Sequence, residues 1–276
     1  GNDAPAIWSF GNSNRVSLTN SITGDDARIL TAGNRSPGII SVSLGQDTST
    51  ADARLLGRNS LIATDGDFSP AVILAATGAE QSKTLLRVSG EHASLRTSGD
   101  FSPASFLEGS YSTVLLDGGS TVYTDGLHSH GTHTQALSTE ATIGTTTSIN
   151  AFGAESDGIY SGVGSGFLNV VNRGLVIGSR TGVSSTARVE IANHGLIQGI
   201  GFSFFQINRF AVMCLIIFIG CDKSSKGHND STQRVRFHGC VQRFGGNNGS
   251  FLGEGGFFSQ EDLRLDRQKF SVSHDK

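Results

Sequence analysis

The segment SLIATDGDFSPAVILA at residues 60–75 returns as SLRTSGDFSPASFLE at residues 94–108, and a looser copy, ILTAGNRSPGIISV, occupies residues 29–42. Two further copies keep the frame without the proline: TVYTDGLHSHGTHT at 121–134 and SINAFGAESDGIYS at 148–161. The glycines at the centre of the copies are Gly33, Gly66, Gly99, Gly126 and Gly153. The first three are equally spaced, and the last two follow at a shorter, equal spacing. Repetition at such periods is typical of solenoid proteins.

A second repeat follows, in which VVNRGLVIG at 170–178 matches IANHGLIQG at 191–199 at a still shorter interval. Within one of the longer periods, short runs with strand-like composition lie at 60–64, 71–75 and 84–88. Turn residues such as Gly, Asp, Ser and Pro separate these runs. The pattern therefore predicts three short strands per repeat.

Three strands per repeat predict an all-β fold, a parallel β-helix in which each strand pairs with its counterpart one repeat away at roughly 4.8 Å. We expect about seven coils and a rod roughly 35 Å long. A β-sandwich or barrel also uses many short strands, but the hairpin dipeptides are scattered here. The alternation of apolar residues predicts ten largely inward side chains: Leu61, Val72, Ile73, Leu85, Val88, Leu95, Phe106, Val114, Leu116 and Val122.

Composition divides the chain near residue 200. Residues 1–200 contain 11 bases, 17 acids and no cysteine, whereas residues 201–276 contain ten bases, seven acids, all three cysteines and 11 of the 17 phenylalanines. A long segment without cysteine suits a protein that crosses an oxidising compartment unfolded. We expect a β-helix domain over 1–200. Over 201–276 we expect an atypical tail with a short apolar segment, and either disorder or a non-native reading frame would account for its composition.

The tail offers several interpretations. Its apolar run at 210–219 is shorter than the roughly 20 residues that a membrane-spanning helix needs. The run precedes Cys221 as in a bacterial lipoprotein signal, although such signals act at the start of a chain. A change of reading frame near residue 200 would explain the abrupt end of the repeats, and a capping or linker segment is the alternative.

The densest group of metal-ligating side chains lies in the fourth repeat: His128, His130 and His133. Alternation along an extended segment would place the first two on one side, where they could bind Zn²⁺ with the third. These histidines occupy the slots of Phe68, Pro70 and Ile73 in the other copies, so surface decoration is the simpler explanation. The sequence therefore predicts no metal site, with these three histidines as weak candidates.

Four aspartates lie beside the repeat glycines: Asp65, Asp67, Asp100 and Asp125. Aspartate at a turn typically binds its own backbone two residues on, which requires no catalytic role. A polysaccharide lyase would need a base beside Ca²⁺-binding acids, and Lys83 is the one lysine in residues 1–200. We predict no catalytic residue and no cofactor, and a net charge of −3 gives no support to nucleic-acid binding.

Three motifs carry a family resemblance: the T-x-G-[DN]-x-S-P-[AG] pattern (Thr31, Gly33, Ser36, Pro37, Gly38 and its copies at Thr64 and Thr97), the run GAESDGIY at 153–160, and N-x-G-x-[IV] at Asn172 and Asn193. Over residues 16–199 the chain resembles the passenger repeats of bacterial autotransporters, the type V secretion system. The resemblance implies a right-handed β-helical stalk on or released from the surface of a Gram-negative bacterium. It also implies a structural or adhesive role towards host or neighbouring-cell glycans or proteins.

The chain departs from that family at both ends. It begins at Gly1 without a leader, and its tail lacks the amphipathic strands of the β-barrel translocator that carries passengers across the outer membrane. We therefore expect an internal fragment without its own translocator. The alternative function is that of a carbohydrate-active β-helix enzyme or a tailspike-like glycan-binding protein, which should have a groove lined by acids and bases from several coils.

Overall fold

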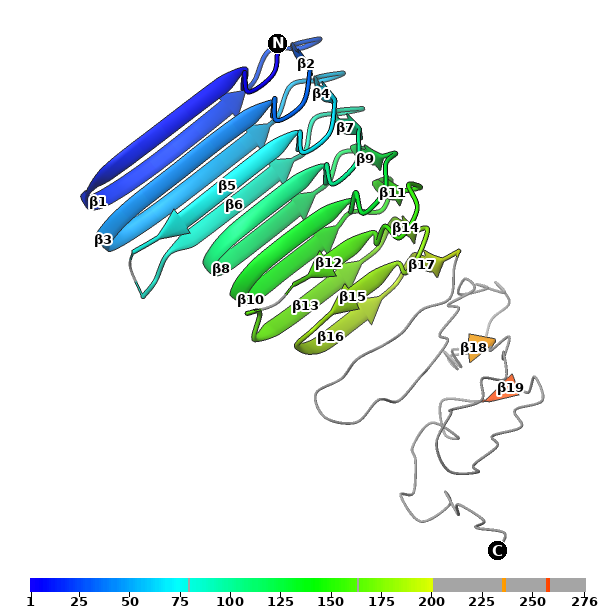
Figure 1. Ribbon diagram of the computed structural model, residues 1–276. Helices are drawn as coiled ribbons and strands as arrows, with labels where there is room; N and C mark the ends of the chain where they lie inside the picture. The colour runs from blue at the N-terminus through cyan, green and yellow to red at the C-terminus, as the bar shows by residue number, and fades with distance from the viewer. Residues whose placement is uncertain (79, 163, 201–234, 237–256, 259–276) are drawn as a thin grey trace, which may run out of the picture.

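A computed structural model of the chain describes residues 1–78, 80–162, 164–200, 235–236 and 257–258 (Figure 1). The described secondary structure is all strand and no helix, and parallel strands stack into a β-solenoid of about six turns. The predicted parallel β-helix is confirmed. Figure 1 shows the coils stacked in chain order, from β1 at the N-terminal end to β17.

Two parallel sheets build the solenoid. The ten-stranded sheet contains β1 (Ile7–Ile22), β3 (Ile39–Leu55), β5 (Val72–Thr77), β6 (Lys83–Val88), β8 (Ser105–Leu116), β10 (Thr132–Ile143), β12 (Ile159–Ser161), β13 (Phe167–Asn172), β15 (Val183–Ser185) and β16 (Arg188–Asn193). The seven-stranded sheet contains β2 (Arg28–Ala32), β4 (Leu61–Asp65), β7 (Ser94–Ser98), β9 (Thr121–Thr124), β11 (Ser148–Ala151), β14 (Leu175–Gly178) and β17 (Leu196–Gly199). In several coils one long strand of the first sheet takes the place of two shorter ones, as β8 pairs with both β5 and β6.

The strand register follows the periods of the sequence. Val72 pairs with Ser105 at the longer interval of the repeat glycines, and Ser105 pairs with Thr132 at the shorter one. In the last coil Leu175 pairs with Leu196, at the interval of the second repeat. Each strand thus lies beside its counterpart in the next repeat, as predicted.

The first coil begins earlier than the family resemblance suggested. Residues 1–7, GNDAPAI, have the same phase as residues 33–39, GNRSPGI, and Ile7 pairs with Ile39. Asp3 and Arg35 occupy the same turn position and both have a left-handed backbone, with φ of 57° and 53°. The repeat therefore extends through the first residues of the chain.

The core is a column of aliphatic side chains between the sheets, and the predicted inward set is partly wrong. Six of the ten are buried: Val72, Val88, Leu95, Val114, Leu116 and Val122. The other four, Leu61, Ile73, Leu85 and Phe106, are half-buried on the outer face, and the residue that follows each of them fills the core: Ile62, Leu74, Leu86 and Leu107. Apolar residues occur on both faces of these strands, so alternation alone does not fix which face points inward.

The last solenoid strand, β17, ends at Gly199, directly before the predicted domain boundary. Beyond it the structure describes two short strands that pair antiparallel, β18 (Val235–Arg236) and β19 (Phe257–Phe258). The three cysteines and the apolar run at 210–219 lie outside the described residues. Within the described part of the chain, no helix has the length and apolarity to cross a membrane.

Candidate functional site

The repeated motif forms the corner where the chain passes from the seven-stranded to the ten-stranded sheet. At this corner the repeat glycines of successive coils touch. A Cβ atom on Gly99 would lie 2.1 Å from the carbonyl oxygen of Gly66, and one on Gly153 would lie 1.8 Å from that of Gly126. These glycines are required because no side chain fits between the stacked backbones.

Three residues after each repeat glycine stands a serine whose hydroxyl links two coils: Ser36, Ser69, Ser102, Ser129 and Ser156. In the shortened last turn Ser179, directly after Gly178, takes the same place. From Ser69 onward, each Oγ accepts the backbone N–H of the serine one coil earlier, at 2.8–3.0 Å. Each of the six also donates to the carbonyl oxygen of the glycine one coil earlier. We call this column the serine ladder. The ladder provides hydrogen-bond partners for buried backbone N–H and C=O groups, which would destabilise the fold if they were left unpaired.

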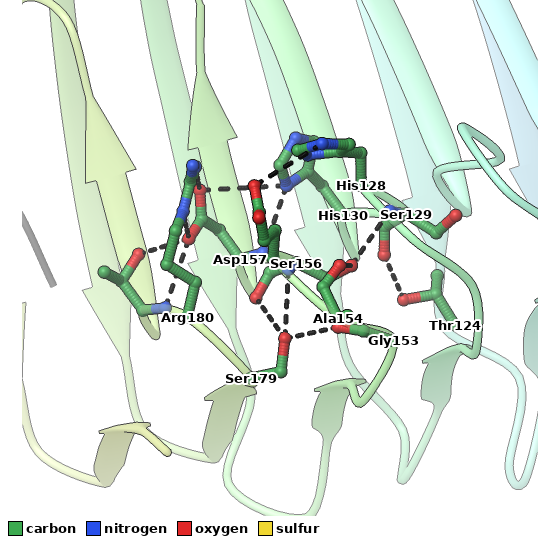
Figure 2. A network of polar contacts seen from close by, with 12 residues as sticks. Thr124, His128, Ser129, His130, Gly153, Ala154, Ser156, Asp157, Ser179 and Arg180 are labelled. Atoms are coloured by element: carbon green, nitrogen blue, oxygen red, sulfur yellow. Dashed lines mark hydrogen bonds and ion pairs between the residues drawn. The ribbon is translucent and has the colours of Figure 1, made fainter. Parts of the chain in front are cut away.

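The slot after the ladder serine changes character along the solenoid. It holds Pro37, Pro70 and Pro103 in successive coils, and then His130, Asp157 and Arg180 in the next three. These three polar residues contact one another from coil to coil (Figure 2). Only His130 of the three is a candidate by residue type, although aligning the copies on the ladder serine places all three in one column.

Asp157 is the centre of this cluster and is 0% exposed. Its Oδ1 accepts hydrogen bonds from Arg180 Nε at 3.0 Å, Thr181 N at 3.1 Å and Thr181 Oγ1 at 2.5 Å. Its Oδ2 accepts from Arg180 Nη2. The hydrogen bond with Asp157 raises the pKa of Arg180, so the guanidinium keeps its charge throughout the ordinary pH range.

His130 is buried against this pair, with 7% of its surface exposed. Its Nδ1 accepts the backbone N–H of Asp157 at 3.0 Å, so the neutral ring carries its proton on Nε2. Burial, followed by the charges of His133, Arg180 and His128, lowers the pKa of His130 to about 3. The 3.7 Å approach of Nδ1 to Asp157 Oδ2 is therefore not an ion pair at neutral pH.

Aromatic rings cover His130 on its outer side. Tyr160 stacks on His130 with ring centroids 4.5 Å apart, and its ring meets that of His133 edge-on at 4.8 Å. Phe106 meets the other side of His133 at 5.0 Å. Burial lowers the pKa of His133 to about 4, and its Nε2 is buried without a hydrogen-bond partner.

His128 occupies a different environment. It adopts a left-handed turn conformation with φ of 53°, so the segment is not extended here as the alternation argument required. Its ring stacks on Phe101 at 5.3 Å, and its Nε2 lies 3.4 Å from Glu155. Surface decoration describes His128, but His130 is buried.

The three histidines do occupy the slots of the other copies, since His133 pairs with Phe106 and His128 stacks in the column of Phe101. Their ring nitrogens do not form a metal site. In residues 1–78, 80–162 and 164–200, no group of three or more His, Cys, Asp or Glu side chains could hold a metal ion.

Three of the four repeat aspartates accept hydrogen bonds from the next coil and not from their own turn. Asp67 Oδ1 accepts the N–H of Asp100 at 3.0 Å, and Asp100 Oδ1 accepts the N–H of Leu127 at 2.8 Å. Asp65 accepts from the Ser98 hydroxyl at 3.1 Å. Asp125 continues the same turn column through its backbone N–H, which donates to Thr97. Asp67 and Asp100 have the expected structural role, but they fulfil it through hydrogen bonds between successive coils and not within one turn.

No family model, curated protein or solved structure matches this chain. Function is therefore inferred from the chain's own geometry. A general acid or base must reach a substrate proton. The carboxylate of Asp157 is fully enclosed and its oxygens already accept four hydrogen bonds, so the cluster is built to hold coils together.

Proposed function

We propose that this chain is part of a non-enzymatic β-helical passenger, surface-displayed or secreted in the manner of bacterial autotransporters, with a structural and adhesive role. The observation that carries the proposal is the serine ladder. From Ser36 to Ser179, one hydroxyl per coil is committed to bonds with the preceding coil. A polar side chain that repeats once per coil and bonds to the preceding coil is what we expect of a structural stalk, because its hydrogen bonds are used within the solenoid.

The carbohydrate-active alternative needs acids and bases that converge on an accessible groove. His130, Asp157 and Arg180 do come from successive coils, but Asp157 has no exposed surface and His130 has 7%. His130 also uses Nδ1 to accept a backbone N–H, which leaves that nitrogen unable to take a substrate proton. This geometry favours the stalk over the enzyme.

Export to the cell surface of a Gram-negative bacterium is supported by the repeat motifs and by the lack of cysteine in residues 1–200. A solenoid also suits passage through a narrow pore, because each coil contacts its immediate neighbours and folds on the coil before it. The proposal implies a C-terminal β-barrel that carries the passenger across the outer membrane.

Contact with host or neighbouring-cell glycans or proteins is the proposed adhesive role. The corner offers a surface for it, because Phe68 and Phe101 stack in parallel at 5.2 Å and remain 56% and 45% exposed. Exposed aromatic rings are common at sites that bind proteins and sugars.

The test is display of the full chain between a signal peptide and an autotransporter barrel in a Gram-negative host. We expect antibody labelling of intact cells and a protease-resistant solenoid at the surface. Gly126→Val is the matched control, since its side chain would collide with Gly99 and should reduce display. Retention of the parent chain in the periplasm would contradict export, and cleavage of polysaccharides by the purified chain would contradict the non-enzymatic assignment.

A further inference from the structure

The two halves of the solenoid differ in the groups that could take up a proton at the same corner. In the early coils the slot after the ladder serine holds proline, and the neighbouring outward column on the first sheet holds Ile40, Ile73 and Phe106. In the later coils the slot holds His130, Asp157 and Arg180, and the column continues with His133 and Tyr160. Ionisable side chains in this slot and in this outward column are thus confined to the C-terminal half of the described solenoid.

The groups that face His130 come from three successive coils. His133 lies on the same strand, β10, and His128 lies in the turn before it. Asp157 and Tyr160 come from the next coil, and Arg180 comes from the coil after that. Glu155 approaches this group through its contact with His128, which it meets at 3.4 Å.

A proton added to His130 or His133 creates an N–H with no acceptor at hydrogen-bond distance in the closed coils that the structure describes. On His130 it would occupy Nδ1 and displace the N–H of Asp157, which then loses its hydrogen bond. The nearest carboxylate oxygen, Asp157 Oδ2, accepts from Arg180 and lies 3.7 Å from His130 Nδ1, beyond the reach of a hydrogen bond. In the cation of His133 both ring nitrogens carry a proton, and the N–H at Nε2 would be buried without a partner. Protonation therefore opposes the packing of these coils.

We propose that the coils around His130, His133 and Asp157 form an acid-releasable end of the solenoid, which opens in mild acid while the proline-bearing coils remain closed. Opening can be confined to this end because a solenoid's stability is a sum over coils and their nearest-neighbour interfaces. The released segment comprises the coils from β10 to β17, which contact the early coils through β8 and β9.

The direction of the pH effect follows from linkage. An unfolded histidine binds a proton below about pH 6.5, whereas His130 and His133 stay neutral in the closed coils down to about pH 3 and about pH 4. Their stabilising effect is complete above pH 6.5 and is lost as the pH falls below it. At pH 5 the opening equilibrium should rise about 30-fold per histidine, or about 1,000-fold for both.

The test is hydrogen exchange of the full chain at pH 7.5 and pH 5.0, corrected for intrinsic exchange rates and read peptide by peptide. We expect protection in β10, β12 and β13 to fall by a factor approaching 1,000, and protection in β3, β5 and β6 to change less than tenfold. In the double variant His130→Asn/His133→Phe, Asn can accept the Asp157 N–H and Phe repeats the side chain of Phe106 in the coil before. This variant should keep its protection at pH 5.0.

The matched control is His92→Asn, an exposed histidine at another corner, which should leave the acid response of the parent chain unchanged. Equal loss of protection in both halves of the parent would overturn the proposal. So would a double variant that opens at pH 5.0 as readily as the parent. If the double variant does not fold at pH 7.5, His133→Phe alone must reduce the acid response about 30-fold.

Discussion

The hydroxyl of Ser102 lies 2.9 Å from the backbone nitrogen of Ser69 in the coil before it, and accepts its N–H. The same hydroxyl donates to the carbonyl oxygen of Gly66 at 3.0 Å. One side chain thus satisfies a donor and an acceptor of the neighbouring coil at a turn where the strands do not pair. Repeated along the corner, this contact explains why serine recurs at the motif's fixed position.

Removing one rung of the serine ladder should weaken the stack. Ser102→Ala leaves the buried N–H of Ser69 without an acceptor, and we expect the free energy of unfolding to fall by about 1–3 kcal/mol. The measurement is urea denaturation followed by circular dichroism. Ser98→Ala is the control, because its exposed hydroxyl bonds Asp65, and it should change stability by less than about 0.5 kcal/mol. Equal effects of the two variants would contradict the ladder's role.

A side chain at a repeat glycine should be tolerated far less than one at an open glycine. Gly99→Ala would place Cβ 2.1 Å from Gly66 O, which requires the coils to separate, whereas Gly24→Ala would meet its nearest atom at 3.9 Å. We expect Gly99→Ala to cost more than about 3 kcal/mol or to prevent folding, and Gly24→Ala to cost less than about 1 kcal/mol. Thermal unfolding of both variants checks this, and a stable Gly99→Ala would disprove the close stacking.

The ion pair between buried Asp157 and half-buried Arg180 should be sensitive to loss of the carboxylate. Asp157→Asn leaves the Arg180 guanidinium without the carboxylate that it contacts through two nitrogens, and we expect a loss of about 3 kcal/mol. Asp3→Asn removes the carboxylate that Arg35 meets at 2.8 Å on the exposed surface, and should cost less than about 1 kcal/mol. Chemical denaturation of both variants provides the comparison. A cost for Asp157→Asn no larger than that of Asp3→Asn would contradict a coil-linking role.

The short last coils should depend on a buried asparagine. Two residues separate Asn172 from Leu175, whereas five separate Leu55 from Leu61 at the same corner of a longer coil. Asn172 compensates by accepting the N–H of Gly174 at 3.1 Å and donating to Asn193 at 2.8 Å.

We expect Asn172→Leu to lower the free energy of unfolding by about 1–3 kcal/mol, because the Gly174 N–H loses its acceptor. Asn150→Leu, on an outer face, should change it by less than about 0.5 kcal/mol. Urea denaturation of the two variants side by side measures the difference. An unchanged midpoint for Asn172→Leu would show that the tight corner needs no side-chain acceptor.

The periods of the solenoid were predictable because stacking demands a glycine at one fixed place per coil, as at Gly66 and Gly99. The inward face was harder to predict, since Ile73 and Leu74 are equally apolar and only the curvature of the coil decides which is buried. Leu74 fills the core and Ile73 lies outside.

The polar cluster could be predicted only in part. His130 is a candidate by its residue type, whereas Asp157 and Arg180 join it only when the copies are aligned on the ladder serine. Their proximity depends on register between coils far apart in the sequence, which local patterns do not contain. The aspartates show the same limit, because a turn residue such as Asp67 looks like a local cap until the next coil lies beside it.

The measurement that tests the coil stack most directly is a set of distances between spin labels along one outer column of the seven-stranded sheet. In that column Leu30, Ala63, Asn150 and Ile177 are joined by strand register. With the three native cysteines replaced by serine, pairs 30/150 and 63/177 span four rungs each and should both give about 19 Å. Pair 30/177 spans five rungs and should give about 24 Å. Distances that do not increase with the number of rungs would contradict the parallel solenoid.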